Sequence, residues 1–300
     1  MRKLLVTGGN GLVGSAIEAD IKIGREFDLT NTAQTQKAFE LHKPTHVIHC
    51  AGKVGGLGGN MNYKGEYLYD NLMINTNVIE EARKAGVTNL VAFLSTCVFP
   101  DSIDYPLTEK KIHLGEPHSS NYPYAYSKRM SDIQIRAYRE QYSVKYTSVI
   151  PCNIYGPNDN FSLDHGHVIP MLMHKIYQAQ QNKSELVIWG DGSPLREFMY
   201  SKDVARLAEW AVDNYDEVEP IIFSTSEEIS IAAVVELLVD AFNFKGAVRF
   251  DKSKPNGQHR KPSDNSKLKT YLPDFKFTPI EEGLTQTVKW FIDNYETSRK

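Results

Sequence analysis

A tyrosine and a lysine one helical turn apart are the first residues of this sequence whose spacing points to chemistry. Tyr124 and Lys128 follow Asn121 and Pro123, and a proline at this place commonly opens a helix, here predicted over residues 123–142. Positions four apart share one helix face, so the ammonium would lie beside the phenol and lower its pKa. The pair is a candidate proton donor and acceptor, although the same spacing also occurs by chance on helix surfaces.

Three glycines near the beginning of the sequence form a second chemical pattern. Gly8, Gly11 and Gly14 follow an apolar run at residues 3–7, and the spacing predicts a strand, a tight turn and a helix that ends at about Asp20. Such a turn lets the backbone approach a pyrophosphate at the helix N-terminus. A glycine-rich turn without a ligand is the alternative. The cofactor-binding candidates here are Gly8, Asn10, Gly11, Leu12, Val13 and Gly14.

The next segment bears on which nicotinamide cofactor would bind. Residues 21–24 read as a minimal second strand, so the first βαβ unit is shorter than usual. An acidic residue at the end of this strand binds ribose hydroxyls, whereas a basic residue binds the 2′-phosphate of NADP(H). Arg25 lies near that end and favours NADP(H), while Asp28 keeps NAD open as the alternative.

Helical and strand patterns alternate along most of the chain, which predicts an α/β protein. Helices are expected at 32–42, 66–85, 123–142 and 203–214, and strands at 45–51, 90–94, 146–151 and 220–223. This alternation is typical of a Rossmann-type doubly wound parallel sheet. The alternation breaks after residue 157, where a helix at 168–181 and a strand at 186–189 indicate a smaller C-terminal α/β substrate-binding domain.

The predicted domain limits follow from these breaks. Residues 1–157, with a returning segment at about 197–225, are assigned to the cofactor-binding Rossmann domain. Residues 158–196 and 226–300 are assigned to the substrate-binding domain, with helices at 231–242 and 280–295.

Composition excludes several classes of function. The 300 residues carry a net charge of -3 at pH 7 without a long basic block, so we expect no nucleic-acid partner. No apolar run approaches the length of a membrane span, and we expect a cytoplasmic protein without a membrane partner. The three cysteines, Cys50, Cys97 and Cys152, are widely spaced, which predicts neither a disulfide framework nor a metal site.

A serine completes the chemical pattern, and the complete pattern resembles that of a known protein family. Ser95 directly follows the strand expected at 90–94 and precedes Tyr124 by about thirty residues. The glycines, this serine and the Tyr-x-x-x-Lys pattern resemble, in this order, the extended short-chain dehydrogenase/reductase family. The resemblance implies that Ser95 hydrogen-bonds a carbonyl oxygen, that Tyr124 exchanges a proton with it, and that Lys128 binds the nicotinamide ribose. The alternative for Ser95 is a residue that merely caps the strand.

The residue two places after Ser95 narrows the resemblance. Dehydratases of the family carry an acidic pair there, whereas this chain has Cys97 and Val98. A cysteine at this place resembles members that epimerise GDP-4-keto-6-deoxy-D-mannose at carbons three and five and then reduce carbon four with NADPH. Further matching segments are residues 51–56, 95–97, 151–157, 159–161, 167–170, 189–192, 196–198 and 254–257.

This narrower resemblance implies roles for further residues. Cys97 would be the base and His167 the acid of the epimerisation, although a free cysteine is more often a packing residue. Pro151, Asn153, Ile154 and His167 would add to the cofactor site, and a homodimer would form through the helices at about 66–85 and 124–142. The implied substrate-binding residues are Asn153, Lys175, Trp189, Arg196 and Lys261. The departures from the pattern are the short segment 20–28, Cys152 and Asn158.

Two other functions remain open from the sequence. One is a nucleotide-sugar epimerase or dehydratase that recycles its bound cofactor without net redox change. The other is a non-catalytic dinucleotide-binding module, although such modules typically lose the tyrosine or the lysine that this chain retains. Stoichiometric consumption of NADPH separates a reductase from both.

Overall fold

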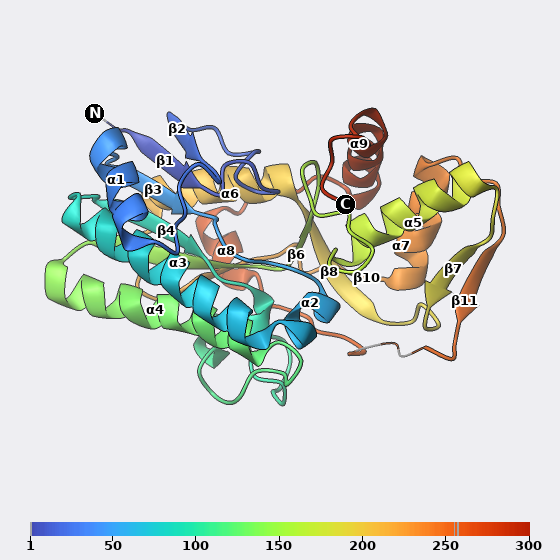
Figure 1. Cartoon of the computed structure of the whole chain (residues 1–300). Coiled ribbons are helices and arrows are strands. Elements are labelled where there is room, and N and C mark those ends of the chain that lie inside the picture. Colours follow the sequence, from blue (N-terminus) through green and yellow to red (C-terminus); the bar gives the residue numbers. More distant parts are fainter. Residues whose placement is uncertain (1, 255, 257) are drawn as a thin grey trace.

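The computed structural model describes residues 2–254, 256 and 258–300. Two lobes lie side by side (Figure 1), and the larger one contains a six-stranded sheet in the order β2-β1-β3-β4-β5-β9. Its strands are β1 (Leu4–Thr7), β2 (Ile21–Ile23), β3 (His46–His49), β4 (Asn89–Phe93), β5 (Lys145–Pro151) and β9 (Ile221–Phe223). All adjacent strands pair in parallel. The predicted Rossmann-type fold is therefore confirmed.

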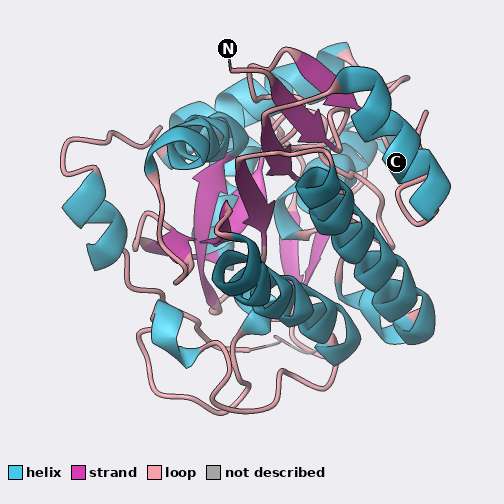
Figure 2. Cartoon of the chain, turned by 90° about the vertical axis from the view of Figure 1, so that its left-hand side faces the viewer, coloured by secondary structure: helices cyan, strands magenta, loops and turns pink. Residues whose placement is uncertain are grey.

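Helices cover both faces of this sheet, which makes it doubly wound (Figure 2). On one face, α1 (Thr32–His42), α3 (Lys64–Lys84) and α4 (Tyr122–Tyr142) pack on a core that contains Leu5, Val47 and Leu90. On the other face, α6 (Ser201–Asn214) and α8 (Ser266–Tyr271) pack on a core that contains Leu4 and Val91. The near-continuous burial of each strand follows from this two-sided cover.

The strand order reverses between β1 and β3, and this places the ligand crevice. From β1 the chain runs to β2 on one side and then returns to β3 on the other side. Open parallel sheets bind ligands at the carboxyl ends of the strands on either side of such a reversal. The short first unit predicted from the sequence is present, since β2 has three residues and forms the edge of the sheet.

The helix predicted between Gly14 and Asp20 is wrong. Residues 8–17 form turns, with one α-helical hydrogen bond from the Ser15 N–H to the Gly11 carbonyl at 3.0 Å and one tighter turn bond from the Ala16 N–H to the Val13 carbonyl at 2.9 Å. The chain must return along the length of β1 to begin β2, a span of roughly 13 Å for four strand residues. A helix rises only about 1.5 Å per residue, so six residues of helix would be too short.

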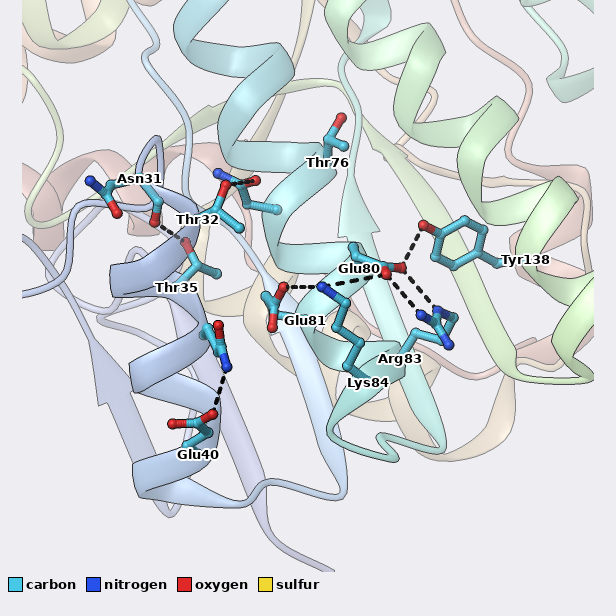
Figure 3. Close-up of polar contacts among 12 residues, drawn as sticks. Asn31, Thr32, Thr35, Glu40, Thr76, Glu80, Glu81, Arg83, Lys84 and Tyr138 are labelled. Carbon is cyan, nitrogen blue, oxygen red and sulfur yellow. Dashed lines mark hydrogen bonds and ion pairs between the residues drawn. The ribbon is translucent and has the colours of Figure 1, made fainter.

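Polar contacts join α1, α3 and α4 on the outer face (Figure 3). The Glu80 carboxylate on α3 accepts hydrogen bonds from the Arg83 side chain at 2.8 and 2.9 Å and from the Tyr138 hydroxyl on α4 at 2.7 Å. Lys84 donates to Glu81 at 2.8 Å. The Arg83 guanidinium lowers the pKa of Glu80 to about 2, and the Tyr138 hydroxyl adds to the shift.

The smaller lobe consists of short sheets and three longer helices. β6 (Asn153–Tyr155), β8 (Leu195–Tyr200) and β10 (Glu228–Ser230) form one sheet, and β7 (Leu186–Trp189) pairs with β11 (Val248–Asp251). Its helices are α5 (Val168–Asn182), α7 (Ile231–Ala241) and α9 (Ile280–Asp293). Their shared core includes Ile169, Val234 and Phe291. The exact domain limits stay a prediction.

Short helices complete the fold at the ends of the strands of the large sheet. They are α2 (Leu57–Asn62) and the two 3-10 turns η1 (Thr96–Val98) and η2 (Glu109–Lys111). Within the described part of the chain, no helix is both long and apolar enough to cross a membrane.

Candidate active site

Two adjoining cavities lie at the reversal of the strand order. One measures about 840 Å³ and extends over residues 24–30, and the other measures about 300 Å³ and extends to the end of β4. Both volumes are in the range of small-molecule sites. The residues that line both cavities are Gly8, Gly11, Cys50, Gly52, Asp159 and Arg299.

The glycine turn forms the junction between the cavities. Gly8 has a φ of +69°, and a Cβ atom there would lie 2.9 Å from the backbone nitrogen of Ala51. A Cβ atom on Gly14 would collide with the Gly8 carbonyl oxygen. Side chains are therefore excluded, and a ligand can lie directly against the backbone. The six cofactor candidates of this turn line one or both cavities.

Both residues considered for cofactor choice line the larger cavity. The Asp28 carboxylate accepts hydrogen bonds from the Thr30 N–H at 3.0 Å and from the Thr30 hydroxyl at 2.7 Å. Among the described residues, no side chain forms an ion pair with Arg25. Asp28 is thus engaged within its own turn, whereas the Arg25 guanidinium is available to an anion.

The smaller cavity contains the predicted serine, tyrosine and lysine together. Ser95, Tyr124 and Lys128 all line it, and the Lys128 Nζ atom lies 5.9 Å from the Tyr124 ring centroid. The expected lowering of the phenol's pKa by the ammonium is wrong. Burial raises the pKa of Tyr124 above its ordinary value, and burial lowers the pKa of Lys128 to about 8. The phenol is therefore protonated at neutral pH, which is the state that a proton donor requires.

Cys97 lies in the same cavity and has a polar neighbour that the sequence did not reveal. Ser95 caps η1, and its hydroxyl oxygen accepts a hydrogen bond from the Cys97 N–H at 3.3 Å. The Asn121 side-chain amide donates to the Cys97 sulfur at 3.0 Å. The turn that follows β4 thus directs both Ser95 and Cys97 toward the space beside Tyr124.

His167 comes to the same cavity from the smaller lobe, at the beginning of α5. Its loop contacts the glycine-rich loop after β3: the Gly56 N–H donates to the His165 carbonyl at 2.7 Å. A Cβ atom on Gly56 would collide with the Gly166 carbonyl oxygen. Burial lowers the pKa of His167, which favours a neutral imidazole.

A buried chain of polar contacts ends at the Ser127 carbonyl, next to Lys128 in the sequence, and no motif predicted it. The Thr7 hydroxyl lies 2.7 Å from His49 Nδ1, and His49 Nε2 lies 3.0 Å from the Asn75 side-chain oxygen. The Asn75 amide donates to the Ser127 carbonyl at 3.4 Å. Burial, with a smaller effect of the Lys128 ammonium, lowers the pKa of His49 to about 3, so this imidazole is neutral.

Pro151, Asn153 and Ile154 line the smaller cavity, and their cofactor-binding role stays a prediction. The Asn153 amide donates to the Glu197 carbonyl at 2.8 Å. Two other predicted residues, Arg196 and Lys261, lie beyond the lining. Burial lowers the pKa of Lys261, and charge interactions link Lys261 to Cys97 and to Arg196.

The remaining predicted substrate residues form a separate group on the smaller lobe. Trp189 is 62% exposed, with Lys175 Nζ at 5.2 Å and Lys254 Nζ at 5.5 Å from its ring. Of the predicted motif 254–257, Pro255 and Gly257 lie outside the described residues. The described residues contain no cluster of His, Cys, Asp and Glu side chains suited to a metal ion.

The comparisons with known proteins agree with this site. Residues 18–225 match the family described as NAD dependent epimerase/dehydratase, and the chain belongs to this family. Relatives at high identity have a more specific name. The chain is 49% identical to "GDP-L-fucose synthase" of Dictyostelium discoideum, over 100% of this chain and 98% of the relative. It is 46% identical to "Probable GDP-L-fucose synthase" of Drosophila melanogaster, over 100% of both chains.

A solved structure agrees as well. The chain resembles a GDP-L-fucose synthetase from Naegleria fowleri bound to NADP, with a TM-score of 0.95 and 46% identity over 100% of this chain and 95% of that one. The family resemblance predicted from the sequence is therefore confirmed.

Proposed function

We propose that this protein converts GDP-4-keto-6-deoxy-D-mannose into GDP-L-fucose, first by epimerisation at carbons three and five and then by reduction at carbon four with NADPH. The observation that carries the proposal is the presence of Cys97 and His167 in the cavity that also holds Ser95, Tyr124 and Lys128. A reductase alone requires only the last three. The NADP-bound relative and the curated relatives support the cofactor and the substrate.

Epimerisation is assigned to Cys97 and His167. A ketone at carbon four acidifies the hydrogens on carbons three and five, so a base can remove one of them and an acid can return a proton on the opposite face. Cys97 comes from the turn after β4 and His167 from the smaller lobe, so the two groups enter the cavity from different elements. The Ser95 hydroxyl and the Tyr124 phenol stabilise the enolate oxygen between them.

Reduction is assigned to Tyr124 and its neighbours. NADPH, when bound, supplies hydride to carbon four. The protonated Tyr124 phenol gives its proton to the ketone oxygen, which Ser95 holds by a hydrogen bond. Lys128 binds the nicotinamide ribose, and its ammonium stabilises the phenolate that remains.

One observation favours the reverse assignment of the acid and the base in the epimerisation. Burial lowers the pKa of His167, and a neutral imidazole accepts a proton more readily than it gives one. His167 would then be the base at one of the two carbons and the Cys97 thiol the acid. Separate rates of solvent-deuterium entry at carbons three and five, in His167→Gln and Cys97→Ser variants, distinguish the two orders.

The substrate nucleotide is assigned to the smaller lobe. Trp189 offers an exposed ring for stacking on the base, with the Lys175 and Lys254 ammonium groups beside it. Arg196 and Lys261, whose charges interact with each other, suit the diphosphate, and Asn153, which lines the smaller cavity, suits the sugar.

The homodimer and the cytoplasmic location belong to the proposal as well. Large apolar side chains remain exposed on α3 and α4, namely Tyr69, Tyr126, Met130, Ile133 and Tyr142. Such a surface suits a four-helix contact between two copies. A mass measurement by light scattering tests the dimer, and Met130→Glu with Ile133→Glu should give monomers.

The test of the function is incubation with GDP-4-keto-6-deoxy-D-mannose and NADPH, with the product identified by nuclear magnetic resonance. GDP-L-fucose formed with one equivalent of NADPH consumed is the expected result. An epimerised or dehydrated sugar without cofactor consumption would assign the chain to the redox-neutral enzymes. Absence of any product, despite NADPH binding, would leave a binding module.

A further inference from the structure

The turn after β1 lacks the usual source of positive charge for a dinucleotide. In the common arrangement, a helix N-terminus faces the pyrophosphate and supplies free N–H groups and roughly half a positive charge. Here residues 8–17 form turns with one α-helical hydrogen bond. A ligand diphosphate at Gly8 and Gly11 therefore needs a positive charge from elsewhere in the chain.

Arg299 lies beside the turn of Gly8 and Gly11, although the sequence separates it from that turn by almost the whole chain. It lines both cavities, at the junction that contains Gly8 and Gly11. Its guanidinium donates to the Asn158 carbonyl, and the Asn158 amide donates to the Ser15 hydroxyl of the glycine turn at 3.1 Å. The Arg299 carbonyl accepts from the Phe161 N–H at 2.8 Å. The arginine is thus held against the turn from both its backbone and its side chain.

The Arg299 guanidinium is available to an anionic ligand, because the carboxylates of the cleft are not paired with it. Lys53 also lines the larger cavity, but its ammonium is paired with Glu66 and Asp70, each at 2.8 Å. In the described part of the chain, no carboxylate lies within ion-pair distance of Arg299. Cations that line a cleft without a carboxylate partner are available to an anionic ligand.

Asp159 provides a second, independent sign of a ligand at the junction. Its side chain is buried, with 3% of the residue exposed, and it lines both cavities. One carboxylate oxygen accepts from the Asn160 N–H at 2.7 Å, while the other has no hydrogen-bond partner among the described residues. A buried polar atom without a partner is costly, so such an atom on a cavity wall indicates a group that binds there.

We propose that Arg299 is a cofactor-binding residue that contacts the diphosphate of NADP(H) and replaces the missing helix N-terminus. Asp159 adds to this site, because burial raises the pKa of its carboxyl to about 7 and the protonated carboxyl can donate a hydrogen bond to a diphosphate oxygen. The inference rests on the proposed cofactor site and adds to it a group from the smaller lobe. Arg25 then discriminates between cofactors through the 2′-phosphate, and Arg299 binds the part that NADPH and NADH share.

The test compares dissociation constants for NADPH and NADH, measured by calorimetry on the full chain. Arg299→Gln should weaken both by a similar factor, about 10-fold to 100-fold, which is the range for losing one charge-assisted hydrogen bond. Arg299→Lys should recover part of the lost cofactor affinity, because lysine restores the positive charge but not the paired N–H donors of the planar guanidinium. Lys300→Gln is the matched control, since it removes the adjacent charge, and both constants should stay at the native values.

Fragments of the cofactor locate the contact. ADP-ribose, which contains the diphosphate, should lose affinity for Arg299→Gln, and 2′-AMP, which lacks it, should not. Unchanged binding of NADPH, NADH and ADP-ribose in Arg299→Gln would overturn the inference, as would a loss confined to NADPH and 2′-AMP, which would place Arg299 at the 2′-phosphate. Thermal unfolding of each variant checks that the fold is retained. Failure of the native chain to bind either cofactor would instead reject the proposed function.

Discussion

Two charged regions of the molecule are built in opposite ways. On the outer face, the Glu80 carboxylate is shared by Arg83 and Tyr138, and Glu81 is paired with Lys84 (Figure 3). In the cleft at the strand ends, one Asp159 oxygen has no partner, and the Arg25 guanidinium has no carboxylate partner within the described residues. The outer charges are satisfied inside the fold, whereas those of the cleft have no partner in the described part of the chain and are free to meet a ligand. Substitutions should therefore weaken the fold in the first region, whereas in the second they should change chemistry or binding, or strengthen the fold.

The largest expected effect is on the chemistry of the cleft. Tyr124→Phe removes one hydroxyl and should lower the rate of reduction by at least ~10²–10⁴-fold, the usual contribution of general acid catalysis. Stability and NADPH affinity should stay close to native, because the ring still fills its buried position. Stopped-flow measurement of NADPH oxidation checks the rate. A variant that kept a third of the native rate would exclude Tyr124 as the proton donor.

The second prediction separates the two reactions of the cleft. Cys97→Ser should abolish epimerisation far more than reduction, because a serine hydroxyl is a much poorer base than a thiol with an ordinary pKa of ~8.5. Ser95, Tyr124 and Lys128 remain, so the variant should reduce the unepimerised sugar to a product with the manno configuration.

Solvent deuterium gives the readout for Cys97. The native enzyme should incorporate deuterium at carbons three and five, and Cys97→Ser should incorporate little at either. Cys50→Ser is the control, because Cys50 lines the same cavity without an assigned role in proton transfer. Native deuterium incorporation by Cys97→Ser would show that Cys97 only packs.

The third prediction concerns how the ionisation of the buried Asp159 carboxyl lowers the stability of the fold. Burial raises the pKa of Asp159 from 3.8 to about 7. Between these values the folded state holds a proton that the unfolded state has released, so this residue lowers the free energy of unfolding as pH rises from about 4 to 7. Asp159→Asn removes the titration and should be more stable than native by about 2–4 kcal/mol at pH 8.5, and similar at pH 4.5.

Urea unfolding at both pH values checks the Asp159 prediction. The groups that face this carboxylate are the Arg299 guanidinium and the Asn160 N–H, and neither titrates in this range. Asp164→Asn, an exposed carboxylate in the following loop, is the control. Equal stability of native and Asp159→Asn at pH 8.5 would mean that Asp159 has no ionisation cost in the fold.

The fourth prediction tests whether Arg25, which has no carboxylate partner among the described residues, selects NADPH over NADH. Arg25→Ala should reduce the preference for NADPH over NADH by about tenfold or more, because it removes the cation assigned to the 2′-phosphate. NADH binding should be nearly unchanged. Dissociation constants for both cofactors check this result. Equal use of the two cofactors by the native protein would contradict the role of Arg25 and would favour the alternative, in which Asp28 binds the ribose of NAD.

The smallest expected effect lies in the outer region. Neighbouring cations and the Tyr138 hydroxyl lower the pKa of Glu80 to about 2. Its contribution to stability is present above the ordinary pKa of about 4.5 and is lost as pH falls toward 2. Because part of the side chain is exposed, Glu80→Gln should cost only about 1 kcal/mol at pH 7. Glu140→Gln, on an exposed face of α4, is the control for urea unfolding, and catalysis should be unaffected by either change.

Much of the fold and the catalytic centre could be predicted from local pattern. The helix that contains Tyr124 and Lys128, the strand that ends before Ser95, and the beginning of α5 after His167 all lie where periodicity placed them. Each of these depends on neighbouring residues of the sequence. The helix after Gly14 failed because its length is limited by the distance back to β2, which local spacing does not contain.

The features missed by the sequence depend on distant contacts. Burial of Tyr124, which sets the direction of its pKa shift, depends on the packing of the whole lobe. The contact between Asn121 and Cys97 joins a helix start to a turn 24 residues away. Arg299 meets Asn158 across 141 residues of sequence. No periodicity or short motif reports such a pairing.

The contact between the loops of Gly56 and Gly166 restricts how the cavity can open. A Cβ atom on Gly56 would collide with the Gly166 carbonyl oxygen, and the hydrogen bond from the Gly56 N–H to the His165 carbonyl joins the two lobes beside the smaller cavity. The loop that carries His167 cannot swing outward alone without breaking this bond. Any opening of the cavity at His167 therefore moves residues of both lobes together or breaks this bond, and hydrogen exchange at the Gly56 N–H reports how often it breaks.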